Sequence, residues 1–243
     1  MTPSFRRFLT GFFASALIPM SLMAQAEPLV SEAKKPIIVE LFSSQSCGAC
    51  PAANEALIDM AETENVFPLV WSVSYWEYIG VKEPYAGPGI LERQRRYADS
   101  FDLRGPYTPQ VVIDGCVQNT GSSPENIRDK IEMVRHEVTP ELTVTISGDT
   151  VVVGSDKPVG SSAVWLAGYL PGITELTPER GRNAGQTLRH MNLATSLKRI
   201  GDWDGLEPER FEFECKAQAC VVIVQESATG EILDFGLVSG VSG

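Results

Sequence analysis

Histidines and basic residues are few in this sequence of 243 residues. It contains two histidines, and its 20 lysines and arginines are outnumbered by 31 aspartates and glutamates, which gives a formal net charge of −11. Nucleic-acid binding requires a basic face for the phosphates, so this charge argues against a nucleic-acid partner. Two histidines leave little room for a histidine-rich metal site, and we expect neither a metal nor another cofactor. The shares of hydrophobic residues (43%) and charged residues (21%) are ordinary for a globular protein, which excludes a disordered tail and a multi-span membrane protein.

Apolar runs long enough to cross a membrane are also lacking. One apolar segment, residues 8–18, lies near the N-terminus between a basic pair, Arg6 and Arg7, and the sequence Ala-Gln-Ala at 24–26. It is shorter than the about 20 residues that a membrane span needs. The three features together are typical of a secretory signal peptide, so we predict that residues 1–26 are removed. We therefore expect an exported protein, periplasmic or secreted, that makes no membrane contact after cleavage.

The remaining sequence divides into two parts that differ in their pattern of apolar residues and turn signals. Residues 27–139 alternate short apolar runs with segments of helical periodicity. Residues 140–243 consist of short strand-like runs separated by turn signals, which is typical of a small β-sandwich. Within this part, residues 171–185 are expected to be a long polar loop. Residues 188–200 fit both a helix and a strand, and we predict a strand. The expected fold class is α/β, with an N-terminal α/β domain followed by a small, mostly β domain.

The motif Cys47-Gly-Ala-Cys50 lies between a predicted strand (36–42) and a predicted helix (52–64). Free N–H groups and the helix dipole favour a thiolate at the start of a helix, so we expect Cys47 to be the helix N-cap and the nucleophile. Cys50 lies three residues on, which is about one helical turn. It is therefore near enough to form a disulfide with Cys47 and to resolve a mixed disulfide with a substrate.

Two other uses of this cysteine pair remain open. An inert structural disulfide would make the protein a non-catalytic secreted binding or folding module. A thiolate metal site would make it a metal-handling protein, but such a site needs about four ligands. The other closely spaced pair, Cys215 and Cys220, is far along the chain, and neither histidine is near Cys47. The strand-to-helix position of the motif favours the redox interpretation.

A proline enters a later predicted strand. Thr108 and Pro109 precede residues 110–114, and proline is unusual in a sheet interior because it has no N–H for the ladder. A cis Thr108–Pro109 bond would present the Thr108 backbone to a substrate chain. The alternative is a trans proline in a turn, which is the commoner isomer. We take both residues as candidates for the catalytic site.

An acidic residue interrupts the apolar run that precedes the motif. Glu40 lies seven residues before Cys47. Burial would raise its pKa, and it would then accept the proton of Cys50 during resolution. The alternative is that Glu40 points to solvent at the edge of a strand.

Aromatic residues follow the second predicted strand, which covers residues 66–73. Tyr75 and Trp76 there, together with Tyr107 beside the Thr-Pro pair, are candidates for lining a groove that binds an extended peptide. The alternative is that they pack against the predicted helix that contains Tyr97. Three arginines of that helix are expected on a solvated face: Arg93, Arg95 and Arg96.

The remaining cysteines predict a structural disulfide. Cys215 and Cys220 flank four residues between two strand-like runs, so a tight hairpin would place them opposite each other. In an oxidising compartment we expect them to be joined, with a second redox relay as the alternative. Cys116 lies at the far end of the strand that begins after Pro109, too far to touch Cys47, and is expected to be a buried free thiol.

These segments resemble the thioredoxin superfamily. The resemblance rests on the strand, the Cys-Gly-Ala-Cys motif, the following helix and the later Thr-Pro pair, and Glu40 is similar in position to the acid of the preceding thioredoxin strand. The loop here is one residue longer, Ser46 replaces the usual tryptophan, and Pro51 follows Cys50, so the chain is not thioredoxin itself. The resemblance implies a thioredoxin-like fold for residues 27–139 and a thiol–disulfide oxidoreductase that acts on protein or small-molecule thiols and disulfides. The direction of the reaction, the redox partner and the oligomeric state stay open.

More narrowly, the chain resembles a family of secreted bacterial proteins catalogued as a domain of unknown function. That resemblance implies a thioredoxin-like fold with a β-rich extension and no settled substrate. The segments that carry it are residues 39–54, 75–80, 93–97, 107–110, 181–188 and 202–205.

Overall fold

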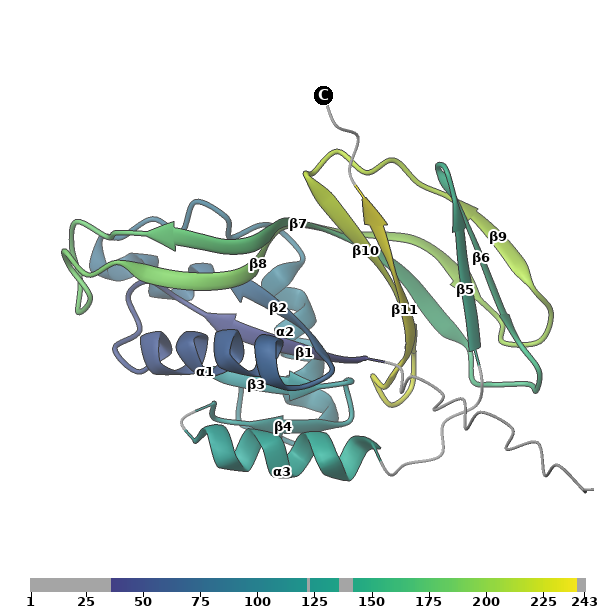
Figure 1. The fold of residues 1–243 in the computed structure, drawn as a ribbon, viewed down its shortest axis with the longest axis horizontal. Helices are drawn as coiled ribbons and strands as arrows, with labels where there is room; N and C mark the ends of the chain where they lie inside the picture. The colour runs from purple at the N-terminus through teal and green to yellow at the C-terminus, as the bar shows by residue number, and fades with distance from the viewer. Residues whose placement is uncertain (1–35, 122, 136–141, 240–243) are drawn as a thin grey trace, which may run out of the picture. The chain divides into compact units, whose positions relative to one another are not determined.

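The computed structural model describes residues 36–121, 123–135 and 142–239, and these residues belong to one compact unit. It is a mixed α/β structure, dominated by a large mixed sheet with a few helices (Figure 1). The predicted signal peptide, residues 1–26, lies outside the described residues. No helix in the described ranges is long and apolar enough to span a membrane.

The helical elements are α1 (Cys50–Thr63), a 3₁₀ helix η1 (Ser74–Ile79), α2 (Ile90–Ser100) and α3 (Pro124–Arg135). The strands before residue 140 are β1 (Ile37–Ser43), β2 (Val66–Ser72), β3 (Gln110–Ile113) and β4 (Val117–Asn119). The later strands are β5 (Leu142–Ser147), β6 (Thr150–Ser155), β7 (Ser162–Leu176), β8 (Leu188–Trp203), β9 (Glu209–Glu212), β10 (Ala219–Glu226) and β11 (Ile232–Ser239).

The large sheet has eight strands in the order β11-β10-β7-β8-β2-β1-β3-β4. Strand β1 pairs with β2 in parallel and with β3 in antiparallel orientation. Strands β2 and β8 pair in parallel through Val70 and Leu193, which joins strands from both sides of residue 140 in one sheet. The predicted domain boundary falls in residues 136–141, outside the described residues, so the division into two domains stays a prediction.

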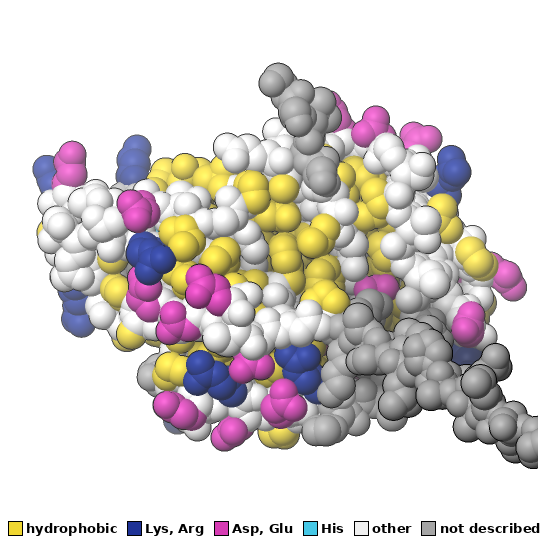
Figure 2. Space-filling view, in the orientation of Figure 1, with side chains coloured by type: hydrophobic (Ala, Val, Ile, Leu, Met, Phe, Trp, Pro, Cys, Tyr) yellow, Lys and Arg dark blue, Asp and Glu magenta, His cyan; other side chains and the backbone are white. Residues whose placement is uncertain are grey.

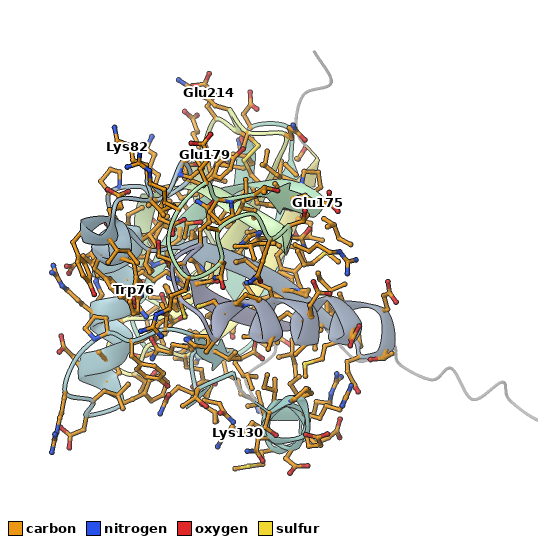
Figure 3. The ribbon with its side chains drawn as sticks, turned by 90° about the vertical axis from the view of Figure 1, so that its left-hand side faces the viewer. Trp76, Lys82, Lys130, Glu175, Glu179 and Glu214 are labelled. Carbon is orange, nitrogen blue, oxygen red and sulfur yellow. A yellow bond between two sulfur atoms is a disulfide. The ribbon has the colours of Figure 1, made fainter. Side chains whose placement is uncertain are left out.

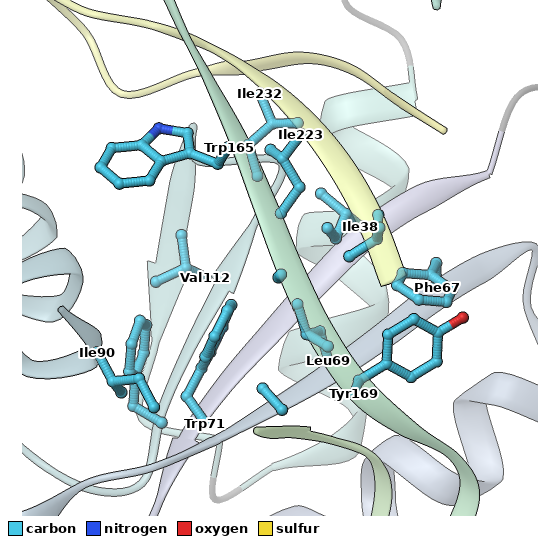
Figure 4. Packing of buried hydrophobic residues seen from close by; sticks show 14 of the residues in the cluster. Ile38, Phe67, Leu69, Trp71, Ile90, Val112, Trp165, Tyr169, Ile223 and Ile232 are labelled. Carbon is cyan, nitrogen blue, oxygen red and sulfur yellow. The ribbon is translucent and has the colours of Figure 1, made fainter. Parts of the chain in front are cut away.

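Strand β1 is buried on both faces, as its largely apolar sequence, interrupted by Glu40, indicates. Ile38 and Phe42 point to the core cluster on the side of α2, whereas Val39 and Leu41 point to the cluster on the side of α1 and α3. Figure 4 shows the first of these clusters, with Ile38 among the side chains that fill it. The carboxyl end of β1 is therefore held between the cluster on the side of α2 and the cluster on the side of α1 and α3. The cysteine motif follows directly after this end of the strand.

A second, three-stranded sheet has the order β5-β6-β9 and packs against part of the large sheet. Side chains of β10 alternate between the two sides: Val221 and Ile223 join the cluster with α2, whereas Val222 and Val224 face the second sheet. Two sheets therefore pack against each other here, but the separate β-sandwich domain predicted for the later residues stays a prediction. One of these two sheets also contains the strands of the N-terminal part.

The structure corrects one predicted loop and confirms one predicted strand. Residues 171–176 belong to β7 and not to a polar loop, and they pair with β8 as far as Leu176 opposite Leu188. The turn residues Pro171 and Gly172 lie at a register shift, where Gly172 has φ of +79°. A bulge accommodates such residues without ending the strand. Residues 188–200 form a strand, as predicted.

Hydrophobic side chains gather in the middle of the face shown in Figure 2, and charged side chains lie mainly around them. Leu237 of β11 is one of the large hydrophobic residues that stay exposed, at 54%. The start of α1 and the loop between β7 and β8 lie at the left end in Figure 1, and the candidate site described below lies there.

Candidate functional site

The two motif cysteines lie at the junction of β1 and α1. Two turns connect the elements: the amide of Cys47 donates to the carbonyl of Ser44 (3.1 Å), and the amide of Cys50 donates to the carbonyl of Cys47 (3.2 Å). The exposed fractions of Cys47 and Cys50 are 3% and 1%, and neither forms a disulfide in the structure. Residues around Cys47 therefore determine which molecules reach its sulfur.

The predicted N-cap is wrong. Helix α1 begins at Cys50, and Ala49 is its N-cap, so Cys47 lies in the turn before the helix. Pro51 occupies the second helical position. This start suits proline, because a residue in the first helical turn needs no N–H for a hydrogen bond within the helix.

The surroundings of the two thiols shift their pKa values in opposite directions. The pKa of Cys47 is lowered to about 6, mainly by a hydrogen bond from Cys50 and further by the Thr108 side chain and the amides of Ala49 and Cys50, against the effect of burial. Burial raises the pKa of Cys50, and its interactions with Cys47 raise it further. The arrangement therefore provides one thiolate and one buried thiol.

The predicted Thr-Pro pair lies beside the cysteines. The Thr108–Pro109 peptide bond is cis, and Pro109 is buried. The hydroxyl of Thr108 hydrogen-bonds the Cys47 sulfur and accepts a hydrogen bond from the indole Nε1 of Trp76 (2.8 Å). Trp76 is thus linked to Cys47 through Thr108. Figure 3 looks onto this end of the structure and labels Trp76 there.

The other predicted aromatic residues differ in their positions. Tyr75 is half-buried and lies within electrostatic range of Cys47 and Cys50. Burial raises the pKa of its hydroxyl, and the neighbouring Gln94 and Thr108 side chains oppose the shift. Both Tyr75 and Trp76 also pack against the core cluster on the side of α2, as the alternative prediction has it.

Tyr107 contacts β4 and α2. Its hydroxyl donates to the Gln118 side chain on β4, and its carbonyl accepts a hydrogen bond from Gln94 (2.7 Å). Burial raises the pKa of the Tyr107 hydroxyl to about 12. The role of Tyr107 in lining a substrate groove stays a prediction.

Glu40 is fully buried and is ion-paired with Arg93 of α2. Arg93 donates from Nε to Oε1 (2.6 Å) and from Nη2 to Oε2 (2.9 Å). Trp71 Nε1 donates to Oε1 (2.7 Å), and the hydroxyl of Tyr97 donates to Oε2 (2.5 Å). These bonds occupy the lone pairs that a proton acceptor for Cys50 would use. That role of Glu40 stays a prediction.

The expectation for Arg93 is wrong. We expected a solvated helix face, but Arg93 is 4% exposed, whereas Arg95 and Arg96 are exposed. Coulombic attraction to Glu40 raises the pKa of Arg93 against the effect of burial. The residues of α2 that face the sheet, Arg93 and Tyr97, are four positions apart and lie on one face of the helix. This spacing is the signal in the sequence that places Arg93 on the buried face of α2.

Two buried polar residues that the sequence did not single out hold the cysteine loop, which we define as residues 44–49. Glu83 accepts hydrogen bonds from the hydroxyl of Ser44 (2.6 Å) and from the amide and side-chain nitrogens of Gln45 (2.7 and 3.1 Å). Burial raises the pKa of Glu83, and these donors oppose the shift. Asn183, from the loop between β7 and β8, donates to the carbonyls of Gln45 (2.9 Å) and Cys47 (3.0 Å). Neither residue has a local sequence signal, because each lies in an irregular polar segment.

Cys215 and Cys220 form the disulfide that the sequence predicts, with their Cα atoms 5.9 Å apart. Cys116 is only half-buried, and its thiol donates to the carbonyl of Asp114 (3.3 Å). Within the described ranges, no group of three or more His, Cys, Asp or Glu side chains is arranged to hold a metal ion.

The sequence matches the family described as "Protein of unknown function (DUF1223)" over residues 38–225. Comparison with curated proteins found no match. Among solved structures, protein AGR_C_4864 from Agrobacterium tumefaciens is similar, with a TM-score of 0.70 and 24% sequence identity, over 88% of this chain and 98% of that chain. HBP35 of Porphyromonas gingivalis is similar with a TM-score of 0.51 and 19% identity, over 86% of this chain and 78% of that chain. At these identities the likeness concerns the fold alone.

Proposed function

We propose that this chain, which belongs to the DUF1223 family of proteins of unknown function, is an exported thiol–disulfide oxidoreductase that uses Cys47 and Cys50 as its redox pair. The observation that carries the proposal is the contrast between the two thiols. The pKa of Cys47 is lowered to about 6, so this residue is largely a thiolate at neutral pH, whereas Cys50 is buried with a raised pKa. A nucleophile and a protected resolving thiol require this difference.

In the proposed reaction the Cys47 thiolate attacks one sulfur of a substrate disulfide. A bond forms between the two sulfurs, the substrate S–S bond breaks, and the first substrate thiolate leaves. Cys50 then gives its proton to the released thiolate and attacks the Cys47 sulfur, which displaces the second substrate thiolate. That thiolate takes up the proton that Cys47 had released to solvent. The protein loses two electrons and the substrate gains them, and the same steps in reverse oxidise a dithiol substrate.

The order of elements supports a thioredoxin-like fold for the first part of the chain. Strand β1 leads through the cysteine motif into α1, β2 pairs with β1 in parallel, and β3 pairs with β1 in antiparallel orientation. Helices α1 and α3 contribute to the cluster on one face of this part of the sheet, and α2 contributes to the cluster on the other. Under the proposal, the strands after residue 140 are an extension of this fold. Export rests on the predicted signal peptide.

The neighbours of Cys47 support a place for an extended substrate chain. The Thr108 side chain contacts the nucleophile, so the backbone of Thr108 and Pro109 lies close by. Its polar groups would pair with a substrate backbone as a short added strand. Tyr75 and Trp76 would border that chain.

Cysteine variants of the purified, reduced protein test this function. We expect Cys47 to be alkylated at pH 7 far faster than Cys50, and we expect Cys50→Ala to trap mixed disulfides with a peptide disulfide that Cys47→Ala does not trap. Cys116→Ala is the matched control and should behave as the wild type. Equal alkylation rates, with no mixed disulfide in Cys50→Ala, would reject the redox assignment in favour of a non-catalytic module. A stoichiometric metal that is bound by the reduced protein and lost in Cys47→Ser would instead favour metal handling.

A further inference from the structure

Three basic side chains border the cysteine loop: Lys82, Arg180 and Arg182. Arg182 packs on Gly48, the residue after the nucleophile. A Cβ atom added at Gly48 would lie 3.2 Å from Cδ of Arg182 and 3.8 Å from its Nη1. Gly48 and Arg182 are both exposed, so the charged end of Arg182 lies at the surface beside the reacting cysteine.

The position of Arg182 is held by its neighbour Asn183, which is 3% exposed. The two hydrogen bonds from Asn183 to the carbonyls of Gln45 and Cys47 tie the loop between β7 and β8 to the cysteine loop. The two loops also approach each other closely at Gly181, where an added Cβ atom would lie 3.5 Å from the hydroxyl oxygen of Ser46. These contacts fix the backbone of the loop at Arg182 relative to Cys47.

A hollow of about 360 Å³ adjoins the cysteine loop, and Gln45 forms part of its wall. Lys82 and Arg180 also line it, and Glu179 is the acid among its lining residues. Figure 3 shows Lys82 and Glu179 in the same upper part of this end of the structure. The hollow thus has room for a polar group of a substrate whose sulfur is at Cys47, two residues from Gln45.

None of these three side chains forms an ion pair with a described residue, although Glu179 lines the same hollow and the carboxylate of Glu83 lies against the cysteine loop. Among the described residues, no acid lies within 4 Å of the charged nitrogens of Lys82, Arg180 or Arg182, whereas Arg189 of the adjoining strand pairs with Glu55 at 2.7 Å. The chain as a whole has a net charge of −11. A basic border around one buried nucleophile in an acidic protein attracts negatively charged molecules and repels positively charged ones.

We infer that the redox site selects anionic disulfides, with Arg182 beside the reacting sulfur and with Lys82 and Arg180 in the adjoining hollow binding the carboxylate groups of the substrate. This inference rests on the proposed function and adds its substrate class. A unit charge several ångströms from the reacting group changes a bimolecular rate by about three- to tenfold in moderate salt. The selection is therefore measurable with disulfides of different charge, when the rates of the wild type are compared with those of Arg182 variants.

The test uses the reduced protein with three probes: glutathione disulfide, which carries net negative charge, 2-hydroxyethyl disulfide, which is neutral, and cystamine, which is positive. Rates of Cys47 oxidation are measured for the wild type, for Arg182→Ala and for Arg182→Glu, each normalised to the rate of that variant with the neutral probe. Arg210→Ala is the matched control, because Arg210 is an exposed arginine of β9 in the second sheet. We expect the wild type to react with glutathione disulfide about three- to tenfold faster than with cystamine, with a smaller ratio as salt increases.

Arg182→Ala should reduce this ratio and Arg182→Glu should reverse it, while the rates with the neutral probe and the ratio of Arg210→Ala stay as in the wild type. Equal rates of the wild type with glutathione disulfide and cystamine would overturn the inference and leave the proposed function standing. An Arg182→Ala variant that slows all three probes alike would also overturn it, because Arg182 would then act on Cys47 and not on the substrate. No reaction of the wild type with the neutral probe would instead reject the proposed function.

Discussion

Trp76 donates its indole N–H to the hydroxyl of Thr108 at 2.8 Å, and that hydroxyl in turn hydrogen-bonds the sulfur of Cys47. Because the Thr108 oxygen accepts a hydrogen bond from the indole N–H, its own proton is available to the thiolate, which lowers the pKa of Cys47. Trp76 comes from the 3₁₀ helix after β2, and Thr108 comes from the segment before β3. Two segments that are distant in the sequence therefore contribute to the acidity of one cysteine.

We predict that Trp76→Phe raises the pKa of Cys47 by less than about one unit, because a single hydrogen bond contributes about 1 kcal/mol and one pKa unit corresponds to 1.36 kcal/mol. The pH profile of Cys47 alkylation measures this shift. Thr108→Val removes the hydroxyl itself and should shift the pKa in the same direction, by at least as much. Tyr78→Phe is the control, since Tyr78 is exposed and its ring stacks on Trp76. A Trp76→Phe profile identical to that of the wild type would exclude this relay.

The rate of Cys47 alkylation should depend on pH with a midpoint near pH 6. A thiol is nucleophilic as its thiolate, so a lowered pKa places the rise of the rate at low pH. The rate should fall about tenfold per pH unit below 6 and be nearly constant above pH 7. In Cys50→Ala the midpoint should move upward, because the hydrogen bond from Cys50 is the largest contribution that lowers the pKa of Cys47. A wild-type midpoint near pH 9, the value of an ordinary thiol, would contradict the assignment of Cys47 as the nucleophile.

The buried pair of Glu40 and Arg93 gives a prediction about stability. Glu40→Gln leaves the buried guanidinium of Arg93 without its counter-charge, which we expect to lower the free energy of unfolding by about 3–5 kcal/mol. Urea unfolding at pH 7 measures the loss. The double variant Glu40→Gln/Arg93→Met removes the unpaired charge and should recover much of it. A small effect of Glu40→Gln on stability, combined with slower closure of the Cys47–Cys50 disulfide, would instead identify Glu40 as the proton acceptor.

Asn183 provides a prediction about access to the sulfur of Cys47. Asn183→Ala leaves two buried carbonyls, those of Gln45 and Cys47, without their donor, so we expect a loss of about 1–3 kcal/mol in the free energy of unfolding. The loop between β7 and β8 should then release the cysteine loop, and a neutral alkylating agent should reach Cys47 faster. Asn126→Ala on α3, an exposed position, is the control and should change neither quantity. Unchanged alkylation in a destabilised Asn183→Ala protein would show that this loop does not limit access.

Much of the local structure follows from local patterns. The apolar run before the motif predicts the buried strand β1, and the apolar residues at 188–200 predict a strand that the structure confirms as part of β8. Where local signals conflict, the prediction fails. Pro171 and Gly172 predict a loop, yet the pairing of β7 with β8 continues beyond them. A long ladder stabilises the strand on both sides of a bulge more than two turn residues destabilise it.

The sequence by itself determined the Cys-Gly-Ala-Cys motif, its place between a strand and a helix, and the pairing of Cys215 with Cys220, because these depend on spacings of a few residues. Only the tertiary structure decided what surrounds the motif. Glu40 and Arg93 are 53 positions apart, and Asn183 is 136 positions from Cys47. Glu40 and Asn183 carry no periodic signal, and the helical spacing of Arg93 and Tyr97 indicates a shared face but not the partner of Arg93. Their partners are set by which strands pair and which loop then lies over the carboxyl end of β1. A buried polar group without a partner costs free energy, so these groups are paired. The arrangement of the strands decides which residues lie close enough to pair with them.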